Sequence, residues 1–342
     1  MKRAFLIKGY LLIAALVLVL AGCTNSSGKN DESVSADSGK VTLDISLSLA
    51  EGSFADVGVQ KFKEELQRLS DGEIDLKVYY NNTFGGEREV IEMMGISSLD
   101  MATTSSGALG TWTKEFNMFD LPYLFKDHDH AYRVFDSEIG KDLADKFENS
   151  ANVKILSYWT AGYRYLSNSV RPVKSVEDVA GMKQRVQENQ VQIDTWKAYG
   201  ANPTPMGWTE VFTGLQQGVI DSQSNPLDSI NTMKFYEVQK YVSKLPELYQ
   251  PYLLMMGKPA FDALSTEHQE IVLQAAANSV EHAREGFEKL DEEATEILKG
   301  KGMEILETDE IDVESFKKKT ESVYEKWAPE FGVDFIEKVR NF

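Results

Sequence analysis

Gly181-Met182-Lys183-Gln184-Arg185-Val186, followed forty positions later by Asp221-Ser222-Gln223-Ser224-Asn225-Pro226, is the most informative stretch of this 342-residue chain. The first segment alternates with period two, as a β-strand does, so Lys183, Arg185 and Gln187 share one face. A guanidinium on a strand near the core needs an anion, and its planar fork of donors matches a carboxylate. Arg185 is therefore a candidate ligand contact, and a structural ion pair with one of the 54 acidic residues is the alternative.

Strand and helix patterns alternate on both sides of this stretch, which predicts an α/β body. The expected strands are Val41–Leu49, Ile74–Tyr80, Leu99–Thr104 and Val153–Trp159. The expected helices lie at Val59–Leu69, Gly86–Met94, His130–Phe147, Val191–Tyr199 and Trp208–Gln217.

A long helix is predicted from an N-cap at Ser265 to about Lys299, because apolar residues recur there at intervals of three and four. At 1.5 Å per residue it extends about 50 Å, more than one small lobe, so it spans two lobes or supports a dimer. After Gly39 no low-complexity linker divides the body. We therefore expect residues 41–342 to form two lobes that are discontinuous in sequence, the second beginning near residue 163.

The N-terminus resembles a bacterial lipoprotein signal. Basic residues precede the apolar run Leu11–Ala21, which is too short for a comfortable membrane span, and Leu20-Ala21-Gly22-Cys23 resembles a lipobox. Residues 1–22 are predicted to be the signal peptide, and Cys23 the lipidated first residue. Since Cys23 is the only cysteine, no intramolecular disulfide can form. A cleaved signal followed by a free thiol is the alternative.

Residues 23–40 are polar and contain almost no apolar side chains, so they are predicted to be a flexible tether. A coil of this length spans roughly 20 to 24 Å and would hold the body close to a membrane. Without the signal the chain carries 33 basic and 54 acidic residues, a net charge of −21. That charge argues against nucleic acid and anionic lipid headgroups as partners, so any anion site must be built locally.

From Val41 to Phe342 the sequence resembles the DctP-type solute-binding receptors of tripartite ATP-independent periplasmic (TRAP) transporters. The resemblance implies two α/β lobes joined by crossing strands, a long connecting helix and a ligand cleft between the lobes. Its marks are Gly85-Gly86-Glu87-Arg88-Glu89, Phe119-Asp120-Leu121-Pro122-Tyr123-Leu124-Phe125, the stretch Gly181–Val186, Gly200-Ala201-Asn202-Pro203-Thr204-Pro205-Met206 and Gly218–Pro226.

The resemblance also implies roles for five residues. The family's arginine in this motif binds the ligand carboxylate and the asparagine before proline helps to hold it, which correspond to Arg185 and Asn225. Arg164 matches a second arginine, Trp208 an aromatic contact, and Glu87 an acid that accepts hydrogen bonds from ligand hydroxyls. The sequence departs from the common pattern at Ser222 and Ser224, where the family has Gly and Glu.

The residues alone leave structural roles open for four of these positions. Arg164 could be a surface arginine, Asn225 a helix cap, Trp208 a core residue, and Glu87 an acid that stabilises the first turn of a helix. Asp127-His128-Asp129-His130 suggests a metal ligand set but is better explained as a solvated helix start. No Gly-x-Ser-x-Gly motif or phosphate-binding glycine loop is present, so no catalytic residue, metal or cofactor is expected.

The predicted function is that of a lipid-anchored receptor on the outer face of the cell membrane or the periplasmic side. It would deliver an organic acid to the small and large TRAP membrane subunits, with transport driven by a sodium gradient as the resemblance implies. Trp208 and Asn202 favour a sugar acid such as a hexuronate or aldonate, with a four-carbon dicarboxylate or a keto acid next. The alternatives are a secreted lipoprotein enzyme acting on acidic sugars and an adhesion or scaffold module.

Overall fold

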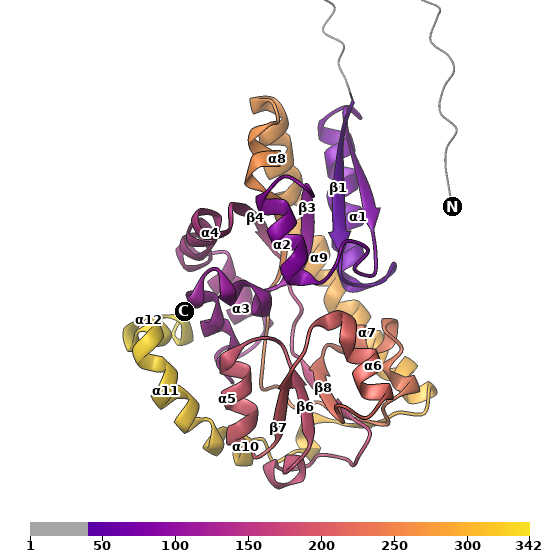
Figure 1. Ribbon diagram of the computed structural model, residues 1–342, viewed down its shortest axis with the longest axis vertical. Helices are drawn as coiled ribbons and strands as arrows, with labels where there is room; N and C mark the ends of the chain where they lie inside the picture. Colours follow the sequence, from indigo (N-terminus) through magenta and orange to yellow (C-terminus); the bar gives the residue numbers. More distant parts are fainter. Residues whose placement is uncertain (1–39) are drawn as a thin grey trace, which may run out of the picture. The chain divides into compact units, whose positions relative to one another are not determined.

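The computed structural model describes residues 40–342, and these form two β-sheets (Figure 1). The five-stranded first sheet has the order β2-β1-β3-β10-β4, and the six-stranded second sheet has the order β11-β9-β5-β8-β6-β7. The first sheet contains β1 (Val41–Leu47), β2 (Ile74–Tyr79), β3 (Met101–Ser105), β4 (Val153–Tyr158) and β10 (Tyr252–Gly257). The second contains β5 (Tyr165–Asn168), β6 (Lys183–Val186), β7 (Asn202–Pro205), β8 (Ser222–Asn225), β9 (Tyr241–Ser243) and β11 (Glu304–Leu306).

Helices cover both sheets, and each sheet with its helices is one lobe. The α-helices are α1 (Phe54–Leu69), α2 (Glu87–Gly95), α3 (His128–Phe135), α4 (Glu138–Ala151), α5 (Gln190–Ala198), α6 (Val211–Gln216), α7 (Leu227–Thr232), α8 (Lys258–Asp262), α9 (Thr266–Gly300), α10 (Val313–Lys319), α11 (Glu321–Phe331) and α12 (Val333–Arg340). The 3-10 helices are η1 (Ser106–Thr111), η2 (Lys114–Asp120), η3 (Val176–Val179), η4 (Trp208–Glu210), η5 (Phe235–Glu237) and η6 (Thr308–Glu310). The predicted signal peptide, Cys23 and the tether up to residue 39 lie outside the described residues.

The first sheet is buried on both faces. Strand β1 pairs in parallel with β2 and β3, whereas β10 runs antiparallel between β3 and β4. Alternate residues of β10 enter opposite clusters: Leu253 and Met255 pack with α2, α3 and α4, while Leu254 and Met256 pack with α1 and α9. This explains why β10 is an unbroken apolar run, as strands covered on both faces are.

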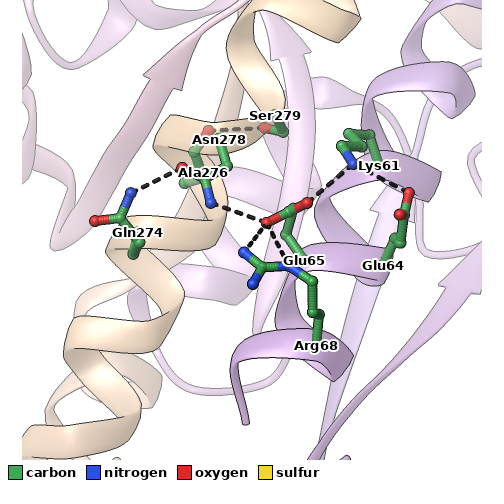
Figure 2. Close-up of polar contacts among 8 residues, drawn as sticks. All are labelled: Lys61, Glu64, Glu65, Arg68, Gln274, Ala276, Asn278 and Ser279. Carbon is green, nitrogen blue, oxygen red and sulfur yellow. Dashed lines mark hydrogen bonds and ion pairs between the residues drawn. The ribbon is translucent and has the colours of Figure 1, made fainter. Parts of the chain in front are cut away.

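Helices α1 and α9 pack along each other and share a partly buried polar contact (Figure 2). The Glu65 carboxylate of α1 accepts hydrogen bonds from Arg68 Nη2 at 2.6 Å and from Asn278 Nδ2 of α9 at 2.8 Å, and Lys61 Nζ lies 2.9 Å away. The bond from Arg68, followed by those from Lys61 and Asn278, lowers the pKa of Glu65 to about 2. The Glu65 carboxylate therefore stays ionised at neutral pH, and its hydrogen bond from Asn278 connects α1 to α9.

The long helix α9 spans both lobes, as predicted. Ser265 caps it by accepting a hydrogen bond from the His268 backbone N–H at 3.1 Å. Its Ala283 and Phe287 lie in the first-lobe cluster that contains α1, whereas a later pair, Ala294 and Leu298, lies in a second-lobe cluster with α6 and α7.

Two extended segments, residues 159–164 and 248–252, also connect the sheets, and we call them the crossing ribbon. They run antiparallel, with the backbone N–H of Ala161 donating to the Gln250 carbonyl and that of Gln250 to the Gly162 carbonyl, each at 3.0 Å. Gly162 has a φ of +56°, and a Cβ there would overlap the ring of Phe287. Because α9 crosses between the lobes as well and leads to β11 of the second sheet, each lobe contains discontinuous segments. A second lobe beginning near residue 163 stays a prediction.

Two predicted helices are each divided. His130–Phe147 was expected as one helix, but Asp136 ends α3 and Ser137 caps α4 by accepting from the Ile139 backbone N–H at 3.1 Å. Trp208–Gln217 consists of η4 followed by α6. A serine that competes for backbone hydrogen bonds interrupts the first, which apolar spacing alone does not reveal.

Candidate functional site

A cavity lies where strand ends from both lobes meet. Ser105 ends β3 of the first sheet, Asn225 ends β8 of the second, and Gln187 follows β6; all three line the cavity. Its volume, measured for the centre of a water-sized sphere, is about 30 Å³. A second cavity of about 170 Å³ adjoins it and shares Glu87, Arg185, Gln187 and Trp208 with it. The site is thus a small hollow between lobes that opens into a larger one.

All five residues predicted to contact a ligand line the first cavity: Glu87, Arg164, Arg185, Trp208 and Asn225. They come from α2, the crossing ribbon, β6, η4 and the end of β8. The fold therefore brings together the residues that the sequence singled out, while their contact with a ligand stays a prediction.

Arg185 is a buried cation, with 4% of its surface exposed. Its Nε and Nη2 donate to the Met206 carbonyl at 3.0 and 2.8 Å, and its guanidinium carbon lies 5.8 Å from the centre of the Trp208 ring. Burial, and then the like charge of Arg164, lower the pKa of Arg185 to about 9. At neutral pH it still carries its charge.

Arg164 is buried too, with 5% of its surface exposed, so it is not a surface arginine. Its Nη1 donates to the Gln250 side-chain oxygen at 2.9 Å and its Nη2 to the Ser224 carbonyl at 2.6 Å. Burial lowers the pKa of Arg164 to about 10, against the opposing effect of Asp120 and Glu87. Two arginines thus lie buried beside one cavity.

Neither arginine has an anion in contact. Among the described residues no carboxylate oxygen lies within 4.0 Å of either guanidinium, and every acceptor that they use is a neutral carbonyl or amide oxygen. Burying an unpaired charge costs several kcal/mol. Of the described residues that line the cavity, Glu87 is the one acid. Two cations and one acid leave at least one net positive charge among the lining side chains, which a ligand carboxylate would offset.

Glu87 begins α2 and also lines the cavity, while its contact with ligand hydroxyls stays a prediction. Its carboxylate accepts hydrogen bonds from the Ser105 backbone N–H at 2.8 Å and from the Ser105 hydroxyl at 3.0 Å. Burial raises the pKa of Glu87, opposed by the Ser105 hydrogen bonds and by Arg185 and Arg164.

Asn225 and Trp208 are also partly structural. The Asn225 side-chain amide donates to Gln223, and Asn225 does not cap α7, whose N-cap is Pro226. Trp208 packs edge to face on Phe235 with ring centres 5.6 Å apart. Its indole N–H is buried and has no hydrogen-bond partner among the residues described. Trp208 is partly buried, packs against core clusters of both lobes and also lines both cavities.

Sequence reasoning missed several residues of the site. Gln187 shares the alternating face of Arg185, so the strand pattern could have identified it. Ser105, Ser48 and Tyr252 also line the cavity, and the Ser48 and Tyr252 hydroxyls are 2.8 Å apart. A serine at a strand end, or a tyrosine that begins an apolar strand, carries no distinguishing signal.

Two sequence indications fall outside the site. Asn202, taken to favour a sugar acid, is exposed, does not line either cavity and donates to the Gly181 carbonyl at 3.1 Å. Asp127 does cap α3, but the start of this helix is not solvated throughout: His130 is fully buried and its Nε2 lies 2.8 Å from the Val339 carbonyl. Across residues 40–342 no cluster of three or more His, Cys, Asp or Glu could hold a metal ion.

Comparison with known proteins gives consistent matches. The model of the DctP family, bacterial extracellular solute-binding protein family 7, matches residues 45–330. A 2,3-diketo-L-gulonate-binding periplasmic protein of Escherichia coli is 32% identical over 250 residues, 73% of this chain and 76% of the relative. No helix within residues 40–342 is both long and apolar enough to cross a membrane.

Solved structures match this chain at similar sequence identity. A TRAP periplasmic solute-binding protein from Polaromonas, bound to D-erythronate, is 33% identical, with a TM-score of 0.84 over 88% of this chain and 98% of that one. The sugar acid binding protein of Advenella mimigardefordensis, in complex with galactonate, is 32% identical, with a TM-score of 0.84 over 88% and 96%. With its two α/β lobes, crossing ribbon and long spanning helix, this chain belongs to the DctP family of solute-binding proteins of TRAP transporters.

Proposed function

We propose that this protein is an extracytoplasmic receptor that captures a small organic acid by its carboxylate and delivers it to the small and large membrane subunits of a TRAP transporter. The observation that carries the proposal is the pair of buried cations, Arg164 and Arg185, whose acceptors are all neutral. A ligand carboxylate supplies the missing anion, and Asn225 and the Trp208 N–H provide polar contacts beside it.

The favoured ligand is a sugar acid such as an aldonate or hexuronate, with a four-carbon dicarboxylate next. One ligand carboxylate offsets positive charge of the two lining arginines. A second ligand carboxylate would lie near the acid Glu87, or near the acids Glu89, Glu188 and Glu210 of the adjoining cavity. Glu87, Gln187 and Ser105 offer hydrogen bonds that suit hydroxyl groups. The ligands of the two solved relatives, D-erythronate and galactonate, have this chemistry.

The proposal includes a lipid on Cys23 and a tether over residues 23–40 that keeps the body at the membrane. Two acyl chains on that cysteine are enough for stable anchoring. By analogy with the family, a sodium gradient rather than ATP would drive transport, and the receptor itself performs no chemistry.

A panel of acids tests the proposal: galactonate, D-erythronate, galacturonate, 2,3-diketo-L-gulonate and succinate. A ligand at one hundred times its Kd stabilises the folded state by about 2.7 kcal/mol, or roughly 5 °C in unfolding temperature. We expect a sugar acid to give this shift, to bind with one-to-one stoichiometry in calorimetry, and to be recovered unchanged. The absence of any shift, or chemical conversion of the acid, would contradict the receptor role.

A further inference from the structure

Gln250 is fully buried in the crossing ribbon and is not among the residues that line the cavity. Its side-chain oxygen accepts from Arg164 Nη1 at 2.9 Å, and its Nε2 donates to Asp120 at 2.5 Å and to the Gln187 side-chain oxygen at 3.0 Å. A guanidinium has only donors and a carboxylate only acceptors, so the amide can satisfy both partners in one orientation only.

The amide separates a carboxylate from a guanidinium. Asp120 is buried, and its other hydrogen bonds come from Gln192 and Asn189, each at 2.8 Å. If Asp120 bonded Arg164 directly, it would neutralise the cation that the ligand needs. With Gln250 between them, Arg164 is held in place by a neutral acceptor and its charge stays available.

The hydrogen bonds continue in one direction to the other side of the cavity. Gln187 Nε2 donates to the Ser105 hydroxyl at 2.8 Å, and that hydroxyl donates to Glu87 at 3.0 Å. Gln187 follows β6 of the second lobe and Ser105 ends β3 of the first, so this link joins the lobes across the cleft. Such oriented chains of hydrogen bonds strengthen one another in a low-dielectric interior.

We propose that Gln250 is a positioning residue of the receptor: it holds Arg164 ready for the ligand carboxylate and, through Gln187, links that arginine to the opposite lobe. This inference rests on the proposed function, because it assigns Gln250 a part in the same site. Carboxylate capture and contact between the lobes are then coupled through one amide.

Two substitutions test the role. In Gln250→Glu the ionised side chain contacts Arg164 and competes with the ligand, whereas its protonated form has a carbonyl and an O–H that replace the amide. In Gln250→Met the hydrogen bonds are lost without a new charge. The charged groups around the position are Asp120 and Arg164 in contact, Glu247 nearby in sequence, and Glu87 and Arg185 at the cavity. All are present in the native protein, so the measured quantity is the ratio of variant to native Kd at each pH.

The probe is galactonate, with D-erythronate used if galactonate does not bind the native protein, and Kd is measured by calorimetry at pH 8 and pH 5.5. We expect Gln250→Glu to bind roughly 30-fold more weakly than native at pH 8 and within about 5-fold at pH 5.5. For Gln250→Met we expect a loss of about 10-fold at both pH values. Gln269→Met is the control, because Gln269 of α9 donates to the Phe261 and Leu264 carbonyls at 3.0 and 3.2 Å and lines neither cavity; its Kd should equal the native value.

The inference is overturned if folded Gln250→Met binds as tightly as native, if the Gln250→Glu ratio is the same at both pH values, or if Gln269→Met loses as much affinity as Gln250→Met. These results leave the receptor function intact, since the native protein binds in each. If neither acid binds the native protein, the expected ligand class fails first and the role of Gln250 fails with it.

Discussion

Replacing Arg185 with methionine should weaken ligand binding and at the same time raise the stability of the ligand-free protein. Burial and Arg164 lower the pKa of Arg185 to about 9 from its ordinary value of 12.5. At about 1.4 kcal/mol per pKa unit, the charged side chain destabilises the fold by on the order of 3 to 5 kcal/mol. Leaving the Met206 carbonyl without its donor costs about 1 to 3 kcal/mol. The ligand-free variant should therefore gain about 2 kcal/mol, within a range of roughly 0 to 4 kcal/mol.

Binding should change in the opposite sense. Removing a buried, hydrogen-bonded charge from its ionic partner costs about 2 to 5 kcal/mol, a loss of roughly 30-fold to several thousand-fold in affinity. Thermal unfolding without ligand and calorimetry with galactonate measure the two effects. Arg185→Lys is the control: it keeps the charge but not the planar fork, so it should bind weakly without the gain in stability. A folded Arg185→Met that is less stable than native and binds normally would refute the reasoning and assign Arg185 to the core.

Three further predictions concern stability, each measured as the unfolding temperature of the ligand-free protein. Burial raises the pKa of Asp291 to about 7 and that of Asp228 to about 6, so the folded state retains protons that the unfolded chain loses near pH 4. Stability should therefore increase as pH falls from 8 to 5, and Asp291→Asn should reduce that increase; an unchanged slope would exclude Asp291 as a source. The low pKa of Glu65 predicts the reverse: Glu65→Gln should cost about 1 to 3 kcal/mol at pH 7 and progressively less below pH 4, and an equal cost at pH 3 would contradict it. Gly162→Ala should cost about 2 to 4 kcal/mol, because a Cβ there meets Phe287 as well as a positive φ, whereas Gly181→Ala, with φ +75° and open space, should cost about 1 kcal/mol. Equal costs would show that contact with Phe287 contributes nothing.

Local periodicity predicted part of the fold. Strands β1 to β4 and helices α1, α2, α5 and α9 were located within a few residues, since each is a local pattern of buried side chains, whereas β10 of the same sheet was not predicted. The order of strands in the sheets could not be predicted this way. Strand β10 pairs with β3 and β4, which lie about a hundred or more residues earlier in the chain, and no local pattern records that pairing.

In the candidate site, too, residues in local motifs could be predicted from the sequence, whereas residues that depend on long-range contacts could not. Arg185 and Asn225 were identified because each lies in a recognisable motif, and Glu87 because the family resemblance places a cleft acid at that position of Gly85-Gly86-Glu87. Gln250 precedes a proline in a segment that resembles an ordinary connection, and Asp120 lies in an aromatic segment that reads as core. Their importance depends on a contact between positions far apart in the chain, which only the folded structure shows.

The position of β10 inside the first sheet also limits when the first lobe can fold during synthesis. During synthesis β1 to β4 emerge first, but β3 and β4 have no partner between them until residues 252–257 have been made. Exposed strand edges are prone to aggregation, and pairing between distant segments slows folding. An N-terminal fragment ending at Tyr158 should therefore not fold as an independent lobe. A soluble first lobe would need a circularly permuted or grafted chain that supplies β10 directly after β3.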